Sequence, residues 1–341
     1  MKGGPAARAR RVAALAGLAA SLPLGPSPAR AHHGGSIARI DPAATWVRGL
    51  GPTEVGVPAP RLNVSMGYVF SRFGRLAEGT GTFDGGEAAV DVHLALVAVS
   101  GRLQTGTEFG ATLPVGVARS SVDGEGTDVQ SGLGDLFLWA SHPIRFASAR
   151  RWFASLHGGV LLPTGRYERD QRVRFRGLES GADGSLDLRA FDTRSSLGAG
   201  STALRVGVQG GYRATDWLRL WAAVDGTQPL HDTPDGIWWG TDLVAGAGAR
   251  MALWRQNVAI RAGGHYAFHA QDRIPSVEDP LRRDAVGGRD EVAVSAGLEF
   301  RWVRAIGCAV AAWVPVWQRA ADVQLVQSVR TQASCALAVG L

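Results

Sequence analysis

The sequence predicts an all-β protein, a membrane-spanning antiparallel up-and-down β-barrel of about twelve strands. Three observations support this fold class. From Arg61 onward, apolar residues alternate with small or charged residues with a period of two. The expected connections alternate between short and long, and aromatic residues gather near the expected strand ends. Together these features are typical of a barrel in a bacterial outer membrane.

The segment 1–31 predicts a cleaved signal peptide. An apolar stretch at 12–22 and a small-x-small cleavage site at Ala29-Arg30-Ala31 follow a positively charged start. That start is made by Lys2, Arg8, Arg10 and Arg11. Because 12–22 is too short to span a bilayer as a helix, an uncleaved anchor is the less favoured alternative. Cleavage would leave His32 as the first residue of the exported chain.

The basic character of the whole chain comes from this leader. The formal charge is +6, but 1–31 holds five of the 36 basic residues and no acidic residue, which leaves 31 basic against 30 acidic residues. The remaining arginines are dispersed, so the basic patch of a nucleic-acid-binding protein is missing and we expect no nucleic-acid partner. No apolar run after the leader reaches the ~18 residues of a transmembrane helix, so a membrane would be crossed by strands.

The segment 32–60 contains four prolines and is not strand-like for most of its length. Two interpretations are open: an N-terminal periplasmic extension, or a partial plug that enters the lumen. His32 and His33 could ligate copper or zinc, but they lack a carboxylate or thiol partner, and a disordered terminus explains them equally well. We therefore predict no metal site and no cofactor.

The barrel is expected over 61–341, and the period of two defines its strands. Leu62, Val64 and Met66 fall on one face, while Asn63 and Ser65 fall on the other. This pattern recurs, with strand ends defined to ~2–4 residues. The expected strands are 61–73, 87–100, 102–114, 131–145, 151–163, 196–213, 216–227, 239–253, 256–269, 289–303, 306–318 and 329–341.

The connections between these strands differ systematically in length. Short connections are expected at Gly101, 145–150, 214–216, 254–255 and 304–305. Long connections are expected at 74–86, 114–130, 164–195, 226–238, 270–290 and 319–328. Short periplasmic turns and long extracellular loops are how outer-membrane barrels are built, so the pattern predicts this orientation.

Aromatic residues predict two girdles at the membrane interfaces. Beside the short turns lie Trp152, Tyr212, Trp217, Trp254 and Trp302. Toward the long loops lie Tyr68, Phe70, Trp238, Trp239, Tyr266, Phe268, Trp313 and Trp317. Trp139 and Trp221 are nearer mid-strand and do not fit the girdles. Outer-membrane lipid is therefore an expected partner.

A set of charged residues is expected to line the lumen, because the apolar face of each strand should meet lipid. These candidates are Asp91, His93, Glu108, Arg205, Arg219, Arg250, Arg261, His265, Glu299 and Arg301. Charges inside a low-dielectric wall must be paired or hydrated. Two interpretations are open: a polar path for a small-molecule solute, or a salt-bridged plug in a closed barrel.

Cys308 and Cys335 are equidistant from a hairpin centre between Ala321 and Asp322. In simple antiparallel register they would face each other on the last two strands, and an oxidising compartment permits a disulfide. The alternative is two small lipid-facing residues. We find no G-x-S-x-G elbow, H-E-x-x-H or phosphate-binding glycine loop, so the chain is not expected to be an enzyme.

Four short strings resemble a bacterial outer-membrane family associated with the phenol meta-cleavage degradation pathway, whose members are described as transporters. They are Gly132-Leu133-Gly134-Asp135-Leu136, Leu162-Pro163-Thr164-Gly165, Gly198-Ala199-Gly200-Ser201 and Val314-Pro315-Val316-Trp317-Gln318. The resemblance implies a barrel that passes small, often apolar or aromatic, compounds.

The C-terminus departs from the usual outer-membrane pattern. Such barrels generally end on an aromatic residue that the assembly machinery, an expected partner, reads. This chain ends Leu337-Ala338-Val339-Gly340-Leu341. The alternation of a final strand is kept, while the aromatic signal for assembly is absent.

Overall fold

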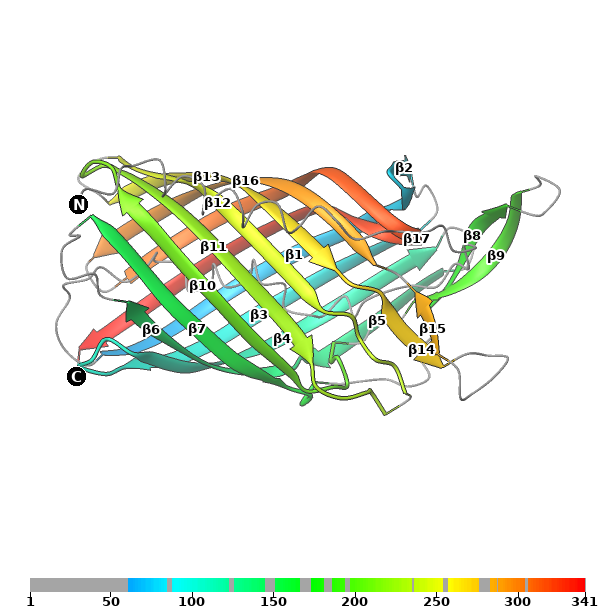
Figure 1. Ribbon diagram of the computed structural model, residues 1–341, viewed down its shortest axis with the longest axis horizontal. Helices are drawn as coiled ribbons and strands as arrows, with labels where there is room; N and C mark the ends of the chain where they lie inside the picture. The colour runs from blue at the N-terminus through cyan, green and yellow to red at the C-terminus, as the bar shows by residue number, and fades with distance from the viewer. Residues whose placement is uncertain are drawn as a thin grey trace, which may run out of the picture. The chain divides into compact units, whose positions relative to one another are not determined.

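Neighbouring strands pair in antiparallel order around a closed sheet, as the computed structural model shows (Figure 1). The structure describes residues 61–84, 88–122, 126–144, 151–165, 173–180, 186–193, 197–234, 236–253, 257–275, 283–286, 288–303 and 306–340, for some of them the backbone alone. Among these residues, none forms a helix long and apolar enough to span a membrane.

The described part of the chain forms seventeen strand segments. They are β1 (Arg61–Gly79), β2 (Gly81–Asp84), β3 (Ala88–Arg102), β4 (Glu108–Val122), β5 (Gly126–Leu133), β6 (Leu136–Ile144), β7 (Trp152–Leu162), β8 (Val173–Ser180), β9 (Leu186–Thr193), β10 (Ala203–Arg213), β11 (Leu218–Pro229), β12 (Asp242–Leu253), β13 (Val258–His269), β14 (Asp272–Pro275), β15 (Arg283–Val286), β16 (Arg289–Val303) and β17 (Ile306–Gly340).

Twelve of the strands form the barrel wall, which confirms the predicted fold class. β5 and β6 pair with successive parts of β4 and act as one barrel strand interrupted at Gly134 and Asp135. β17 supplies two strands, because 306–320 pairs with β16 and 324–340 pairs with β1. The pairing of β17 with β1 closes the sheet, so no long barrel edge is left unpaired.

Large apolar side chains cover the outside of the barrel. Met66 is 64% exposed, Val206 56% and Leu156 55%, and each points away from the lumen. Strand neighbours such as Ser65 and Arg205 point inward, as the period of two requires. A surface with so many exposed aliphatic side chains is suited to lipid rather than water.

Short turns gather at one end of the barrel, here called the turn end, and longer connections at the other, the loop end (Figure 1). The expected turn at Gly101 is wrong, because β3 continues to Arg102 and the chain turns at 103–107. There the Leu103 amide donates to the Thr107 carbonyl at 2.8 Å, and Gly106 has a φ of 89°, which favours glycine.

Much of the expected long loops is strand. β4 runs to Val122 and β5 starts at Gly126, although 114–130 was expected to be a loop, and the region 319–328 lies within β17. The loop-end connections also contain the hairpins β8–β9 and β14–β15. Strand pairing satisfies backbone groups whether or not one face is apolar, so hairpins beyond the apolar belt leave no strong period-two signal.

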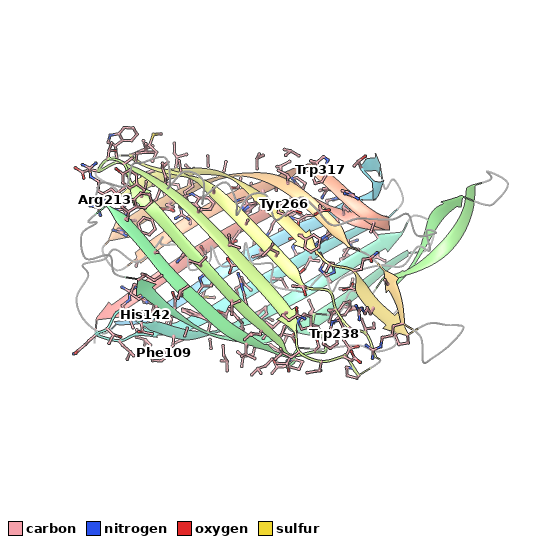
Figure 2. The ribbon with its side chains drawn as sticks, viewed as in Figure 1. Phe109, His142, Arg213, Trp238, Tyr266 and Trp317 are labelled. Carbon is pink, nitrogen blue, oxygen red and sulfur yellow. A yellow bond between two sulfur atoms is a disulfide. The ribbon has the colours of Figure 1, made fainter. Side chains whose placement is uncertain are left out.

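The expected aromatic girdles are found in part. At the turn end, Trp152 and Trp217 are exposed, and the Trp152 and Tyr212 rings lie 4.8 Å apart. At the loop end, Tyr266 and Trp317 lie on the outer surface (Figure 2). The others with described side chains are Tyr68 and Phe70, which point outward, Phe268, on an outward register position, and Trp238, in a loop.

Four tryptophans lie inside instead. Trp239 and Trp313, expected in a girdle, are only 3% and 4% exposed, and Trp139 and Trp221 take inward register positions. Mid-strand position and inward orientation together explain why Trp139 and Trp221 did not match an interfacial pattern. Trp254 and the Trp302 side chain lie outside the described residues.

Candidate functional site on the inner wall

The strand register places most of the expected lumen residues on the inner face. Those with inward positions are Glu108, Arg205, Arg219, Arg250, Arg261, His265, Glu299 and Arg301. Arg301 lies at the turn-end mouth and is exposed. The inner wall is therefore charged over several neighbouring strands.

Asp91 and His93 are the exceptions, since both point outward. They share β3 with Val90, Val92, Leu94 and Leu96, whose side chains are buried on the inner face. On the outside, Asp91 forms an ion pair with Arg72 at 3.9 Å, and His93 Nδ1 lies 2.6 Å from the Tyr68 hydroxyl. The expectation that the charged face is always the inner face is wrong for this strand.

Buried Asp225 joins side chains from three neighbouring strands of the wall. Arg205 on β10 donates to Asp225 Oδ1 on β11 through Nη2 at 2.9 Å and Nε at 3.2 Å. His157 Nε2 on β7 lies 2.6 Å from the same oxygen. Gly207 makes room, because a Cβ there would lie 2.4 Å from His157 Nε2. Sequence reasoning missed His157 and Asp225, although both fall on inward positions of correctly predicted strands.

A second ion-pair group lies nearer the turn end. Arg250 Nε on β12 donates to Glu299 Oε2 on β16 at 2.7 Å, and Arg261 on β13 contacts the other oxygen of the same carboxylate. Across the lumen, Glu108 accepts from Ser100 Oγ at 2.7 Å and from Arg102 at 3.5 Å. Each described inner carboxylate of these groups thus has a donor, as burial requires.

Glycines let inner aromatic rings lie against the barrel wall. A Cβ on Gly248 or Gly263 would lie 2.7 Å from Trp221 Cζ2, and a Cβ on Gly211 would lie 2.3 Å from Phe153 Cζ. Only a residue without a side chain leaves this space. The Trp221 ring therefore packs against the backbone of β12 and β13 rather than extending straight into the lumen.

Further rings continue this aromatic surface around the wall. His265 lies 5.7 Å from Trp221 and 6.5 Å from Trp313 between ring centroids, and its Nε2 is 2.9 Å from Ser295 Oγ. The Arg330 guanidinium lies 5.7 Å from the Trp313 ring centre, within the range of a cation–π contact. The inner wall therefore contains aromatic rings as well as charge.

Three of the strings that carry the family resemblance meet at one carboxylate near the loop end. Asp135 accepts from the amide of Ala199 at 2.7 Å and of Gly165 at 3.0 Å. The Ala199 carbonyl accepts from Trp239 Nε1 at 2.7 Å, so the β11–β12 connection is joined to the same point. We call Asp135, Gly165, Ala199 and Trp239 the loop-end cluster.

The loop-end cluster is extended by apolar packing and by a second carboxylate. Leu197 packs near Gly116 on the inner face of β4, and Ile237 is buried with Ala199 and Trp239. Asp272 accepts from the Gly240 amide at 2.6 Å and lies 3.1 Å from His269 Nε2. Hydrogen bonds therefore hold together the β7–β8, β9–β10 and β11–β12 connections and Asp272 at the start of β14.

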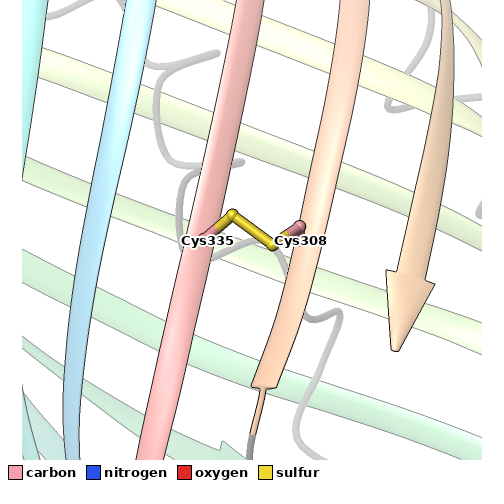
Figure 3. The surroundings of a disulfide bond; sticks show 2 residues. All are labelled: Cys308 and Cys335. Carbon is pink, nitrogen blue, oxygen red and sulfur yellow. A yellow bond between two sulfur atoms is a disulfide. The ribbon is translucent and has the colours of Figure 1, made fainter. Parts of the chain in front are cut away.

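Cys308 and Cys335 lie on the outer face of the last two strands, and the structure joins them by a disulfide (Figure 3). Their Cα atoms are 4.0 Å apart. The described residues include no group of three or more His, Cys, Asp or Glu placed to hold a metal ion. His32 and His33, and the whole of 1–60, lie outside the described residues.

Comparison with known proteins gives structural matches only. No protein-family model and no curated protein matches the chain. An outer membrane channel from Pseudomonas putida F1 aligns with a TM-score of 0.65 and 13% identity, over 84% of this chain and 98% of that structure.

Two other solved structures align less well. The translocator domain of the autotransporter NalP from Neisseria meningitidis has a TM-score of 0.44 and 12% identity, over 86% of this chain and 92% of its own. The CymD monoaromatic hydrocarbon channel has a TM-score of 0.38 and 10% identity, over 87% of this chain and 93% of its own. At these identities the likeness concerns the fold, and the P. putida structure shows that this chain has the architecture of an outer-membrane β-barrel.

Proposed function

We propose that the chain is an outer-membrane channel for small molecules. The observation that carries this proposal is the contrast between an outer face of exposed aliphatic side chains and an inner face of ion-paired charges, glycines and aromatic rings. Under this proposal 1–31 directs export, the assembly machinery inserts the barrel, and the turn end faces the periplasm. The channel needs no cofactor and performs no catalysis.

The solutes we propose are small and apolar or aromatic. Trp221 is partly exposed on the inner wall, and the buried rings of His265 and Trp313 lie beside it. Flat rings can stack on such surfaces without a specific hydrogen-bond pattern. The resemblance to the phenol meta-cleavage family supports the same class, and membership of that family is part of the proposal.

Reconstituted protein tests the channel directly. Liposomes containing the folded barrel should swell when small solutes are supplied outside, and planar bilayers should show discrete conductance steps. The control is the same protein denatured before reconstitution. A folded barrel that passes neither ions nor small solutes would contradict the proposal.

The loop-end cluster favours a second candidate, a closed barrel whose extracellular loops bind a partner. Asp135 accepts hydrogen bonds from the β7–β8 and β9–β10 connections, and Ile237 and Trp239 are buried beside Ala199. In that case wild-type protein should pass nothing, and deletion of 166–194 should abolish partner binding without changing permeability. A channel limited by the loop-end cluster should instead conduct more in Asp135→Ala, while Asp216→Ala in an exposed turn leaves conductance unchanged.

We also propose that the Cys308–Cys335 disulfide forms in the exported protein. An oxidising periplasm permits it, and the two residues face each other across paired strands. Protein unfolded without reductant should resist thiol alkylation and become doubly alkylated after reduction, which mass spectrometry detects. Free alkylation of both residues before reduction would show that the bond is absent.

A further inference from the structure

Three charged residues lie side by side on the outside of the barrel, toward its loop end. In the strand register, Arg72 on β1 pairs with Asp91 on β3, and Asp91 pairs with Arg119 on β4. They point outward, since the neighbouring side chains of Val90 and Ala118 are buried on the inner face. We call Arg72, Asp91 and Arg119 the outer charged row. Charges on the lipid-facing side of a barrel are costly at the middle of the bilayer and cost little near its surface.

The apolar surface beside the outer charged row places the row at the edge of the membrane. Ten residues away on each strand, toward the turn end, the same register aligns Leu62, Gly101 and Phe109. Between the two levels, exposed apolar side chains such as Tyr68 and Val117 cover the outside. Ten residues span about 33 Å along a strand, or about 25 Å along the membrane normal at a tilt of about 40°. Since this matches the height of the apolar band of an outer-membrane barrel, the row lies where lipid chains end and headgroups begin.

The outer charged row has two guanidinium groups and one carboxylate. Arg72 Nη1 lies 3.9 Å from Asp91 Oδ2, near the outer limit of an ion pair, and 53% of the Arg72 side chain is exposed. Arg119 is exposed as well, and no described residue accepts a hydrogen bond from either guanidinium. The row therefore has an excess of one positive charge and N–H donors that are open to the surroundings.

Aromatic side chains lie next to the outer charged row on its membrane side. Phe70 precedes Arg72 by two residues on the outer face of β1, and Tyr68 precedes it by four. The Tyr68 hydroxyl lies 2.6 Å from His93 Nδ1, and the Phe70 and His93 ring centroids are 5.0 Å apart. Because aromatic rings prefer the interface between lipid chains and headgroups, these rings mark the depth at which the arginines reach the headgroups.

We propose that Arg72 and Arg119 bind a phosphate group of a lipid in the outer leaflet of the outer membrane. Guanidinium groups bind phosphate oxygens through paired hydrogen bonds, and basic clusters at a membrane surface recognise anionic headgroups. Asp91 balances one of the two positive charges, and the lipid phosphate balances the other. The inference rests on the proposed orientation, in which the loop end faces outward, and does not require the barrel to conduct.

Lipid binding to the folded, delipidated protein in detergent tests the site, with native mass spectrometry as the measurement. Lipid A with both phosphates should bind more tightly than the same lipid with its phosphates removed. Inorganic phosphate should not bind detectably, because it lacks the acyl chains that contact the apolar belt. Arg72→Gln and Arg119→Gln should each weaken lipid A binding about tenfold, as expected for loss of a charged hydrogen bond. Arg72→Lys keeps the charge but not the paired geometry and should weaken binding about threefold.

A second outward arginine at the loop end provides the matched control. Arg319 on β17 is directly opposed to Asp290 on β16, and Asp290 also accepts a hydrogen bond from the Tyr266 hydroxyl. This group has one guanidinium for one carboxylate, so Arg319→Gln should leave lipid A binding unchanged. If Arg72→Gln does not fold, Arg119→Gln on another strand carries the same test.

Equal binding of lipid A with and without its phosphates overturns the inference, and so does equal binding by the wild type and both glutamine variants. Liposome swelling is measured separately, so either result leaves the proposed channel standing. A barrel that binds lipid A as expected but passes no solute keeps the lipid site and overturns the channel.

The orientation is tested on intact cells with an epitope tag inserted in 166–194. Antibody binding to intact cells supports a loop end that faces outward. A tag that is reached only after the cells are lysed overturns both the orientation and the inference.

Discussion

The two sides of the inner wall are built differently. On β3, the inward side chains of Val90, Val92 and Leu96 are at most 2% exposed, like the core of a soluble protein. On β10 to β13, glycines, aromatic rings and arginines face the lumen, and few of them are fully buried. We call these the packed wall and the charged wall.

The difference follows from what covers each wall. The packed wall is apolar because it meets other side chains, including Val69 and Phe73 of β1 and Leu197 of the β9–β10 connection. The charged wall keeps polar groups inside by pairing them with one another, as Arg205 does with Asp225. The inward residues of each wall thus match the groups that they contact. Only the charged wall has the polar groups that a water-filled path needs.

Asp225 should be the most sensitive position of the charged wall. Asp225→Ala leaves the Arg205 guanidinium and His157 buried without their shared acceptor, so the free energy of unfolding should fall by about 3–5 kcal/mol. Chemical unfolding in micelles, followed by tryptophan fluorescence, measures the change. The exposed turn carboxylate of Asp216 is the control, and Asp216→Ala should alter stability by about 0.5 kcal/mol or less. Equal effects of the two variants would show that the ion pair contributes nothing.

The sequence is sufficient to predict the twelve strands, because each crosses a belt in which one face must be apolar. The same alternation predicts several inward positions on β10 to β16, among them Arg205, Arg250 and Glu299, although Asp225 on β11 was missed. On β3 it fails, since Val97 and Val99 on one face are as apolar as Leu94 and Leu96 on the other, and Asp91 and His93 misleadingly mark one face as polar. A charged residue outside the lipid-facing belt does not indicate which face of its strand points inward.

The strand register across the long connections could not be predicted from the sequence. The opposition of Arg219 with Arg250 requires the register across the long β11–β12 connection, and a shift of one residue would remove it. The loop-end cluster depends on connections whose paths have no period. The pairing of Cys308 with Cys335 needed only a hairpin centre, so its geometry was accessible from spacing alone.

The packed wall should respond to loss of volume as a protein core does. Leu96 is buried at less than 2% exposure on the inner face, so Leu96→Ala should lower the free energy of unfolding by about 2–4 kcal/mol. Leu204 points outward and is 41% exposed, so Leu204→Ala should cost about 1 kcal/mol or less. The same unfolding measurement in micelles compares them. If Leu96→Ala is as mild as Leu204→Ala, the inner face of β3 is not a core.

The glycines of β12 and β13 should tolerate a methyl group only where no other atom lies close to the added Cβ. At Gly248 a Cβ would lie 2.2 Å from the Ala262 carbonyl oxygen and 2.7 Å from Trp221 Cζ2, so Gly248→Ala should lower stability by about 1–3 kcal/mol. Gly264 points outward with nothing within 4 Å, and Gly264→Ala should be neutral or slightly stabilising. Because Gly248→Ala also displaces Trp221, it should change the tryptophan fluorescence of the folded protein, whereas Gly264→Ala should not. Equal stability and fluorescence in both variants would mean that the Trp221 ring does not rest on the glycine surface of β12 and β13.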